Sequence, residues 1–231
     1  LASLQQMGGA VKWLGTYGIQ FFDRPIIGGI IFLLPVMGLF ATTACVLRRR
    51  TKSHWLWVPL AAWLAVAQLL SLYDFNFYWW GALALCLAMG VLWFWSLLKP
   101  SLTRNILFAF SIPFIAWLLG AVVLVYVLAG ICLFVDKKSW KLAWLVPVTL
   151  YIVSVAFFYV GNRCPSLMVA VSPMMYFEPL LDISYYHLVT WVMTVLVWGG
   201  CRWLPMAQKK VWVWCICIVS WILPAGVLLQ Y

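Results

Sequence analysis

The chain of 231 residues is 67% hydrophobic and only 9% charged, whereas a soluble domain is about 45–50% apolar and about 25% charged. This composition excludes a water-soluble surface, and the long apolar runs lack the alternation of a membrane β-barrel. A net charge of +10 would suggest nucleic-acid binding in a soluble protein, but here the basic residues occupy short loops between apolar runs. We therefore predict an all-α, polytopic helical membrane protein that binds no nucleic acid.

Residues 1–24 form the first predicted unit. They are too polar and too rich in glycine to cross a bilayer, yet their apolar side chains recur with helical spacing. The pattern predicts an amphipathic helix in the membrane interface, followed by a turn at Asp23, Arg24 and Pro25. The predicted apolar stripe consists of Leu4, Met7, Val11, Leu14, Tyr17 or Gly18, and Phe21.

Residues 25–231 form the second predicted unit, a transmembrane helical domain. The apolar run 105–135 is too long for one straight helix across a hydrocarbon core about 30 Å thick. Pro113 and the Gly120 region could divide it into a hairpin of two short helices, which gives about eight membrane helices in all. The predicted spans are 25–47, 55–73, 80–98, 105–135 as a hairpin, 142–160, 183–203 and 211–230.

The basic residues support this hairpin. With the loop 48–54 inside the cell, a hairpin at 105–135 keeps nearly all Lys and Arg on the inner side, as the positive-inside rule requires. A single span would move the basic loops of 136–141 and 202–210 outside. The sequence thus predicts a multi-pass protein of the bacterial inner membrane, with its inner side near anionic lipid headgroups. The basic residues left outside are Lys12, Arg24 and Arg163.

The acidic residues gather on the predicted outer face. Only Asp136 lies inside, although carboxylates contribute little to orientation. We interpret this clustering as a functional signal. The acids predicted to lie outside are Asp23, Asp74, Glu178 and Asp182. Because the chain begins with Leu1 on this outer side, we also expect it to be part of a longer protein.

Two of these acids have simple structural alternatives. Asp23 could act as a general base or metal ligand, or it could end the amphipathic helix beside Arg24. Asp74 with Asn76 could coordinate a cation or a sugar hydroxyl, or the two could form an Asx turn between antiparallel helices.

Glu178 and Asp182 are four residues apart, so they would share one face of a helix. With His187 they could supply a catalytic acid and base. Alternatively, Pro179 and the carboxylates could simply begin the span 183–203, because proline and acidic side chains are both favoured at helix N-termini.

Arg163 is the one basic residue of the long loop 161–182, where it could bind a substrate phosphate or form a salt bridge. The Cys residues show no metal-binding spacing, so no metal site is predicted. Nucleotide-binding, zinc-protease and hydrolase motifs do not occur, and the cofactor is left unknown.

Two resemblances extend this interpretation. The stretches GGAVKWLGTYGIQFFDRPIIGG and LLSLYDFNFYWWGALALCLAMG resemble a family of Bacteroidota polytopic membrane proteins of unknown function. The layout, an interfacial helix before many spans with carboxylates outside, is similar to that of polytopic class C glycosyltransferases. This second resemblance implies a lipid-linked sugar donor and a catalytic acid at Asp23.

Three functions follow as hypotheses. The chain could be the membrane scaffold or anchor subunit of a larger envelope assembly with protein partners. It could instead be a glycosyltransferase that uses a lipid-linked donor at the outer face. A transporter is the third alternative, and the predicted spans lack the central charges that ion coupling usually requires.

Overall fold

The computed structural model describes residues 2–50, 54–74, 76–100, 102–134, 144–177 and 186–201. Nine α-helices and two short 3-10 helices account for most of this part of the chain, which confirms the all-α prediction. The predicted span 211–230 lies outside the described residues. The helices are α1 (Gly9–Ile19), α2 (Pro25–Arg50), α3 (His54–Leu72), α4 (Trp79–Leu97), α5 (Leu102–Leu119), α6 (Val123–Phe134), α8 (Leu145–Val160), α9 (Leu167–Val171) and α10 (Tyr186–Gly200), with η1 (Ala2–Gln5) and η3 (Pro173–Tyr176).

Three of the described helices, α2, α4 and α5, are long and apolar enough to cross a membrane. Further apolar helices of the same bundle, such as α6 and α8, are shorter. This composition is compatible with an integral membrane protein, because lipid-embedded backbone must satisfy its hydrogen bonds within helices.

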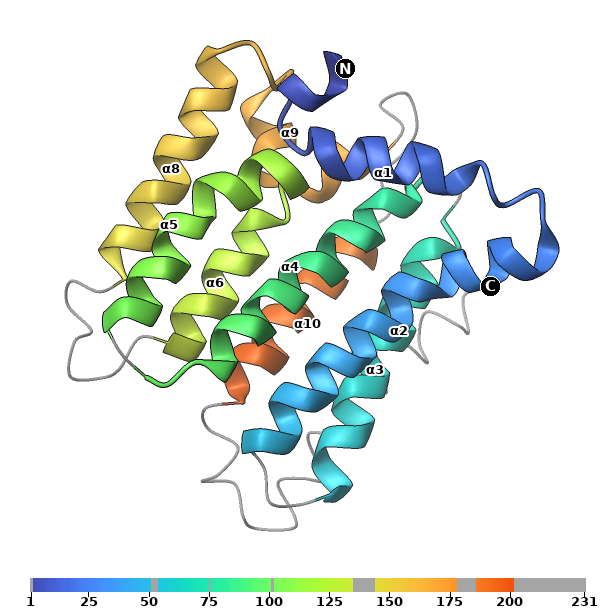
Figure 1. Ribbon diagram of the computed structural model, residues 1–231, viewed down its shortest axis with the longest axis horizontal. Coiled ribbons are helices and arrows are strands. Elements are labelled where there is room, and N and C mark those ends of the chain that lie inside the picture. The colour runs from blue at the N-terminus through green and yellow to red at the C-terminus, as the bar shows by residue number, and fades with distance from the viewer. Residues whose placement is uncertain are drawn as a thin grey trace.

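Helix α4 forms the centre of the bundle (Figure 1). It contacts α1, α2, α5 and α6, and most of its residues from Trp79 to Leu92 are buried. A helix that is apolar on all sides is expected in this position, because neighbours surround it. The long helices run roughly along one another, and α1 lies across their ends (Figure 1).

The run 105–135 divides into α5 and α6, which lie side by side as a hairpin (Figure 1). The division is at Gly120, whose φ of 85° favours glycine. Pro113 lies inside α5, so the suggestion that it also divides the run is wrong. Tyr176 stabilises the turn, because its hydroxyl donates to Leu119 O at 2.7 Å and accepts from Val122 N at 2.9 Å.

Helix α1 uses two faces rather than the single predicted stripe. Met7 and Val11 are buried, and Gly15 lies against Trp80, where an added Cβ would clash with the Trp80 side chain. Leu14 and Tyr17, which belong to the predicted stripe, are exposed, so the stripe is only partly buried and that prediction is corrected. An exposed aromatic face on a helix across the bundle end is typical of a membrane-interface helix. Its large exposed residues are Trp13, Leu14, Tyr17 and Ile19.

Charge is divided between the two ends of the bundle. Both described carboxylates, Asp23 and Asp74, lie at the end where α1 crosses, which we call the α1 end. Arg48, Arg49 and Arg50 end α2 at the opposite end, where α4 also ends and α5 begins. Lys99 and Arg104 lie there too. The described Lys and Arg at the α1 end are Lys12, Arg24 and Arg163.

Candidate functional site

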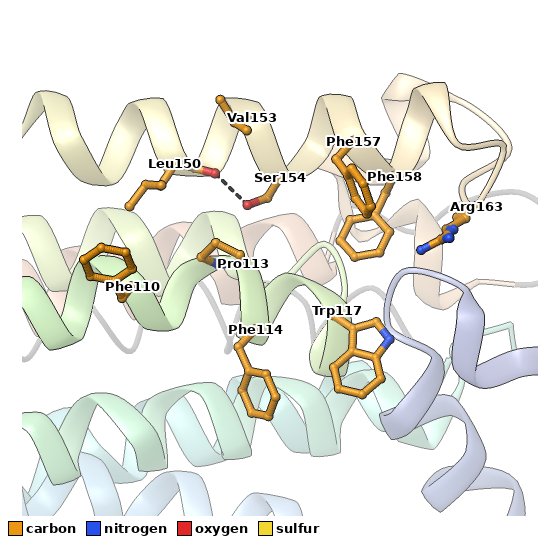
Figure 2. A pocket seen from close by; sticks show the side chains of 10 residues that line it. All are labelled: Phe110, Pro113, Phe114, Trp117, Leu150, Val153, Ser154, Phe157, Phe158 and Arg163. Carbon is orange, nitrogen blue, oxygen red and sulfur yellow. Dashed lines mark hydrogen bonds between the residues drawn. The ribbon is translucent and has the colours of Figure 1, made fainter.

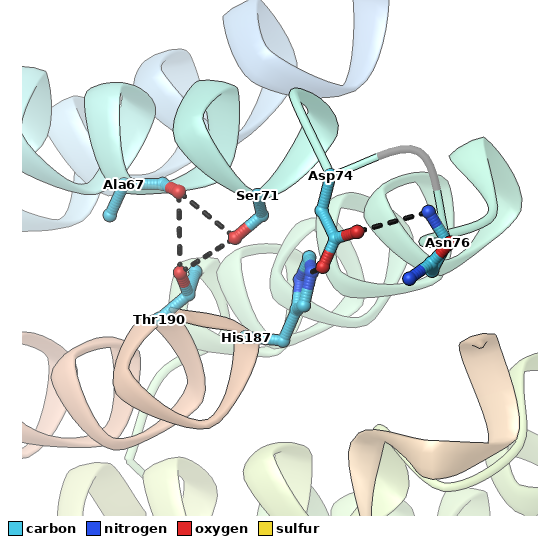
Figure 3. Close-up of polar contacts among 6 residues, drawn as sticks. All are labelled: Ala67, Ser71, Asp74, Asn76, His187 and Thr190. Carbon is cyan, nitrogen blue, oxygen red and sulfur yellow. Dashed lines mark hydrogen bonds and ion pairs between the residues drawn. The ribbon is translucent and has the colours of Figure 1, made fainter. Parts of the chain in front are cut away.

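Asp74 and His187 lie together at the α1 end, where α3 ends and α10 begins (Figure 3). The distance from Asp74 Oδ2 to His187 Nε2 is 3.8 Å. Asp74 is held by a turn, because its Oδ1 accepts a hydrogen bond of 3.0 Å from the backbone N–H of Asn76. That contact is the Asx turn expected as the structural alternative for these two residues.

Aromatic rings enclose the histidine. The imidazole stacks on the Phe77 ring with centroids 3.7 Å apart, and it forms a T-shaped contact with the Phe177 ring at a centroid distance of 4.6 Å. An isolated antiparallel bridge between Phe77 and Phe177 joins the two loops that carry these rings. His187 is consequently only 2% exposed, and Asp74 is 14% exposed.

The facing atoms of the pair, Asp74 Oδ2 and His187 Nε2, are buried and have no hydrogen-bond partner among the described residues. Their separation of 3.8 Å is too long for a hydrogen bond. Buried polar atoms are nearly always hydrogen-bonded in native proteins, because an unpaired one costs about 1–3 kcal/mol. A small approach of the two side chains would let these atoms hydrogen-bond to each other.

A polar seam continues from this pair between α3 and α10. The hydroxyls of Ser71 and Thr190 lie 3.0 Å apart. Both are also within hydrogen-bond distance of the Ala67 carbonyl, which accepts from them (Figure 3). Gln68 is buried nearby, with no partner for its Oε1 among the described residues. Such hydroxyl contacts join helices in membranes, where no water competes for them.

This arrangement could support proton exchange. A carboxylate and an imidazole can act as acid and base when they reach a reacting group directly or through one water. Here the rings of Phe77 and Phe177 cover the imidazole, so a substrate would reach it only if the two loops separated. The described residues contain no group of three or more His, Cys, Asp or Glu side chains that could hold a metal ion.

Of the other predicted site residues, Asn76 contacts Asp74, whereas Asp23 and Arg163 make no described contact with the pair. Asp23 is exposed in the turn between α1 and α2. Arg163 is exposed after α8 and lies 5.4 Å above the Phe157 ring. Glu178 and Asp182 lie outside the described residues, so their predicted shared helix face stays a prediction.

Several residues of the site had not been singled out from the sequence. They are Ser71, Thr190, Phe77 and Phe177, which surround or extend the pair. Ser71 and Asp74 are three residues apart, as are His187 and Thr190. Polar pairs with this spacing, each at the outer end of an apolar helix, are a pattern from which the contact could have been predicted.

The sequence matches a family described as Family of unknown function (DUF6057) over residues 2–228. The chain belongs to this family. The match supports the part of the first resemblance that predicted a family of unknown function, and it covers nearly the whole chain. No curated protein and no solved structure matches this DUF6057 member.

Proposed function

We propose that the protein is a multi-pass protein of the bacterial inner membrane that serves as the membrane scaffold or anchor of a larger envelope assembly. Its α1 end faces outward and its basic end faces the cytoplasm, near anionic headgroups. The observation that carries this proposal is the enclosure of His187 by Phe77 and Phe177, whose rings and backbone bridge join two loops and cover the imidazole instead of leaving it open to a substrate.

The orientation follows from the division of charge and from α1. The described basic residues concentrate at the end opposite to α1, as the positive-inside rule requires. The exposed aromatic face of α1 includes Trp13 stacked on Tyr17, with centroids 6.1 Å apart. Trp and Tyr prefer the membrane interface, so α1 would lie in the plane of the outer headgroups.

Epitope insertions test the orientation. One tag is placed after Asn162, at the α1 end, and a matched tag is placed after Pro100, between α4 and α5 at the opposite end. Intact spheroplasts should bind antibody against the first tag only, and permeabilised spheroplasts should bind antibody against both. Labelling of the second tag in intact spheroplasts would overturn the proposed orientation.

An enzyme is the second candidate, and the unpaired atoms of Asp74 and His187 favour it. In that case the pair would activate an acceptor hydroxyl, as in transfer of a sugar from a lipid-linked donor. Asp74→Asn keeps the shape of the carboxylate, and His187→Phe keeps a flat aromatic ring of somewhat larger size; both remove the acid–base function. Asp23→Asn is the control, since Asp23 is exposed and apart from the pair.

Complementation of a deletion strain separates the two candidates. A scaffold should tolerate both shape-preserving variants when their membrane levels match the wild type. An enzyme that uses the pair should lose complementation with both while Asp23→Asn complements fully. Loss with both, at normal membrane levels, would therefore replace the scaffold proposal with the enzyme.

A further inference from the structure

A groove with a volume of about 570 Å³ lies between α5 and α8, away from the Asp74–His187 pair. Its volume is in the range of small-molecule sites, about 300–1,000 Å³. Figure 2 shows side chains of α5 and α8 along the groove, with Arg163 at the end nearest the N-terminal helices. The lining residues are Phe110, Pro113, Phe114, Trp117, Leu150, Val153, Ser154, Phe157, Phe158 and Arg163.

The walls of the groove are apolar and open to the side. Phe110, Phe114 and Phe157 are 71%, 56% and 59% exposed. Ser154 is the one hydroxyl in the lining, and it donates to the carbonyl of Leu150 at 2.6 Å within its own helix. Along its length the groove therefore presents hydrocarbon surface to a ligand, and its serine hydroxyl is already used as a donor.

Arg163 gives the groove a charged end. Helix α8 ends at Val160, and Asn162 adopts a left-handed conformation with φ 53°, which turns the chain back. The backbone N–H of Arg163 then donates to Phe158 O at 2.9 Å, and the Arg163 carbonyl accepts from Met7 N at 3.3 Å.

The side chain of Arg163 is fixed less tightly than its backbone. The guanidinium lies 5.4 Å above the Phe157 ring, and it makes no ion pair with either carboxylate in the described part of the chain. The guanidinium, with its five N–H donors, is therefore exposed at one end of an otherwise apolar groove. A planar guanidinium matches the oxygens of a phosphate group well.

We propose that this groove binds an anionic phospholipid, with one acyl chain between α5 and α8 and the phosphate on Arg163. The proposal rests on the proposed membrane location, and the groove opens sideways, where lipid would surround the bundle. The chemistry is complementary along the whole groove, because a hydrocarbon chain would contact the aromatic side chains and the anionic phosphate would contact the guanidinium of Arg163.

Two adjacent residues of α8 supply a matched test of the groove. Val153 and Ile152 are 56% and 59% exposed, but only Val153 lines the groove. Delipidated protein in detergent is titrated with phosphatidylglycerol, and one-to-one complexes are counted by native mass spectrometry. Val153→Trp should weaken binding about tenfold or more, by filling the groove. Ile152→Trp should bind as the wild type does, and equal binding by the two variants would overturn the proposal.

The charged end is tested with a second matched pair. Arg163→Gln should weaken phosphatidylglycerol binding about tenfold, because a charge-assisted phosphate contact is lost. Arg24→Gln removes an exposed arginine at the same end of the bundle but outside the groove, and it should have no effect. An equal loss of phosphatidylglycerol binding in both variants would show that net charge alone attracts the lipid, and it would overturn the proposed phosphate site.

The same titration is repeated with competing ligands. Inorganic phosphate should not displace the lipid, and phosphatidylcholine should bind more weakly than phosphatidylglycerol. Tighter binding of a polyprenyl phosphate or of an uncharged lipid would overturn the proposed occupant. Extraction of the protein from membranes by alkaline carbonate would instead refute the membrane location, so the two failures are distinguishable.

Discussion

The helix pairs α3–α10 and α5–α8 both reach the α1 end of the bundle, but they are joined in different ways. Between α3 and α10 the hydroxyls of Ser71 and Thr190 meet across the interface. Between α5 and α8 the hydroxyl of Ser154 returns to its own helix, and aromatic side chains leave a groove. Both pairs pack closely along their backbones, so the difference lies in the side chains at the contact. The first interface is therefore closed, and the second has room for a ligand.

The largest expected effect concerns the imidazole at the outer end of the closed interface. His187→Ala removes a buried ring stacked on Phe77, and replacing a buried aromatic by alanine typically costs about 3–5 kcal/mol of unfolding free energy. His187→Phe keeps the ring and should retain most of the stability. Thermal unfolding of the purified protein in detergent measures both.

Equal destabilisation by His187→Ala and His187→Phe would contradict this interpretation. It would show that the contact with Asp74, rather than the ring packing, stabilises the closed end. The same result would also weaken the use of His187→Phe as a shape-preserving variant in the complementation test.

A smaller effect is expected from crowding the closed interface. Ala67→Leu adds bulk where the carbonyl of Ala67 meets Ser71 and Thr190, and overpacking typically costs about 1–3 kcal/mol. Val153→Leu adds one methylene in the open groove, where space is available, and should leave the unfolding temperature nearly unchanged. If the two substitutions lower the unfolding temperature equally, the proposed difference in packing between the closed and the open interface is wrong.

The sequence was sufficient for the features that depend on local pattern. Apolar runs predicted the helices, and the length of 105–135 together with Gly120 predicted the α5–α6 hairpin. The charge map placed Asp23 and Asp74 at one end, together with α1. These inferences succeed because helix length and loop charge are decided within a short stretch of chain.

Contacts between distant segments were harder to predict. Asp74 was expected with Asn76, and the structure adds His187, which a different helix supplies. Tyr176 had no predicted role, yet its hydroxyl satisfies the backbone of the α5–α6 turn. The apolar stripe of α1 was split because glycines let one face pack on Trp80, and amphipathic spacing alone does not reveal which face has a protein partner.

A double-mutant cycle measures the hydroxyl contact itself. Ser71→Ala and Thr190→Val each remove one partner of the 3.0 Å contact between α3 and α10. The coupling energy should be about 0.6 kcal/mol and no more than about 1.7 kcal/mol, the range found for hydrogen bonds between membrane helices. Chemical unfolding of the four proteins gives this value, and a coupling of zero would mean that the seam is held by packing alone.

The smallest expected effect distinguishes two buried serines that look alike in the sequence. Ser71 bonds across an interface, whereas Ser154 bonds only to Leu150 within α8. Ser154→Ala should therefore change the unfolding free energy by less than about 0.5 kcal/mol, because no helix pair loses a shared contact and the Leu150 carbonyl keeps its place in the helix. Ser71→Ala should cost about 1 kcal/mol, since it leaves Thr190 without this partner. A larger loss at Ser154 than at Ser71 would reverse the comparison and would identify α5–α8 as the interface that depends on its polar group.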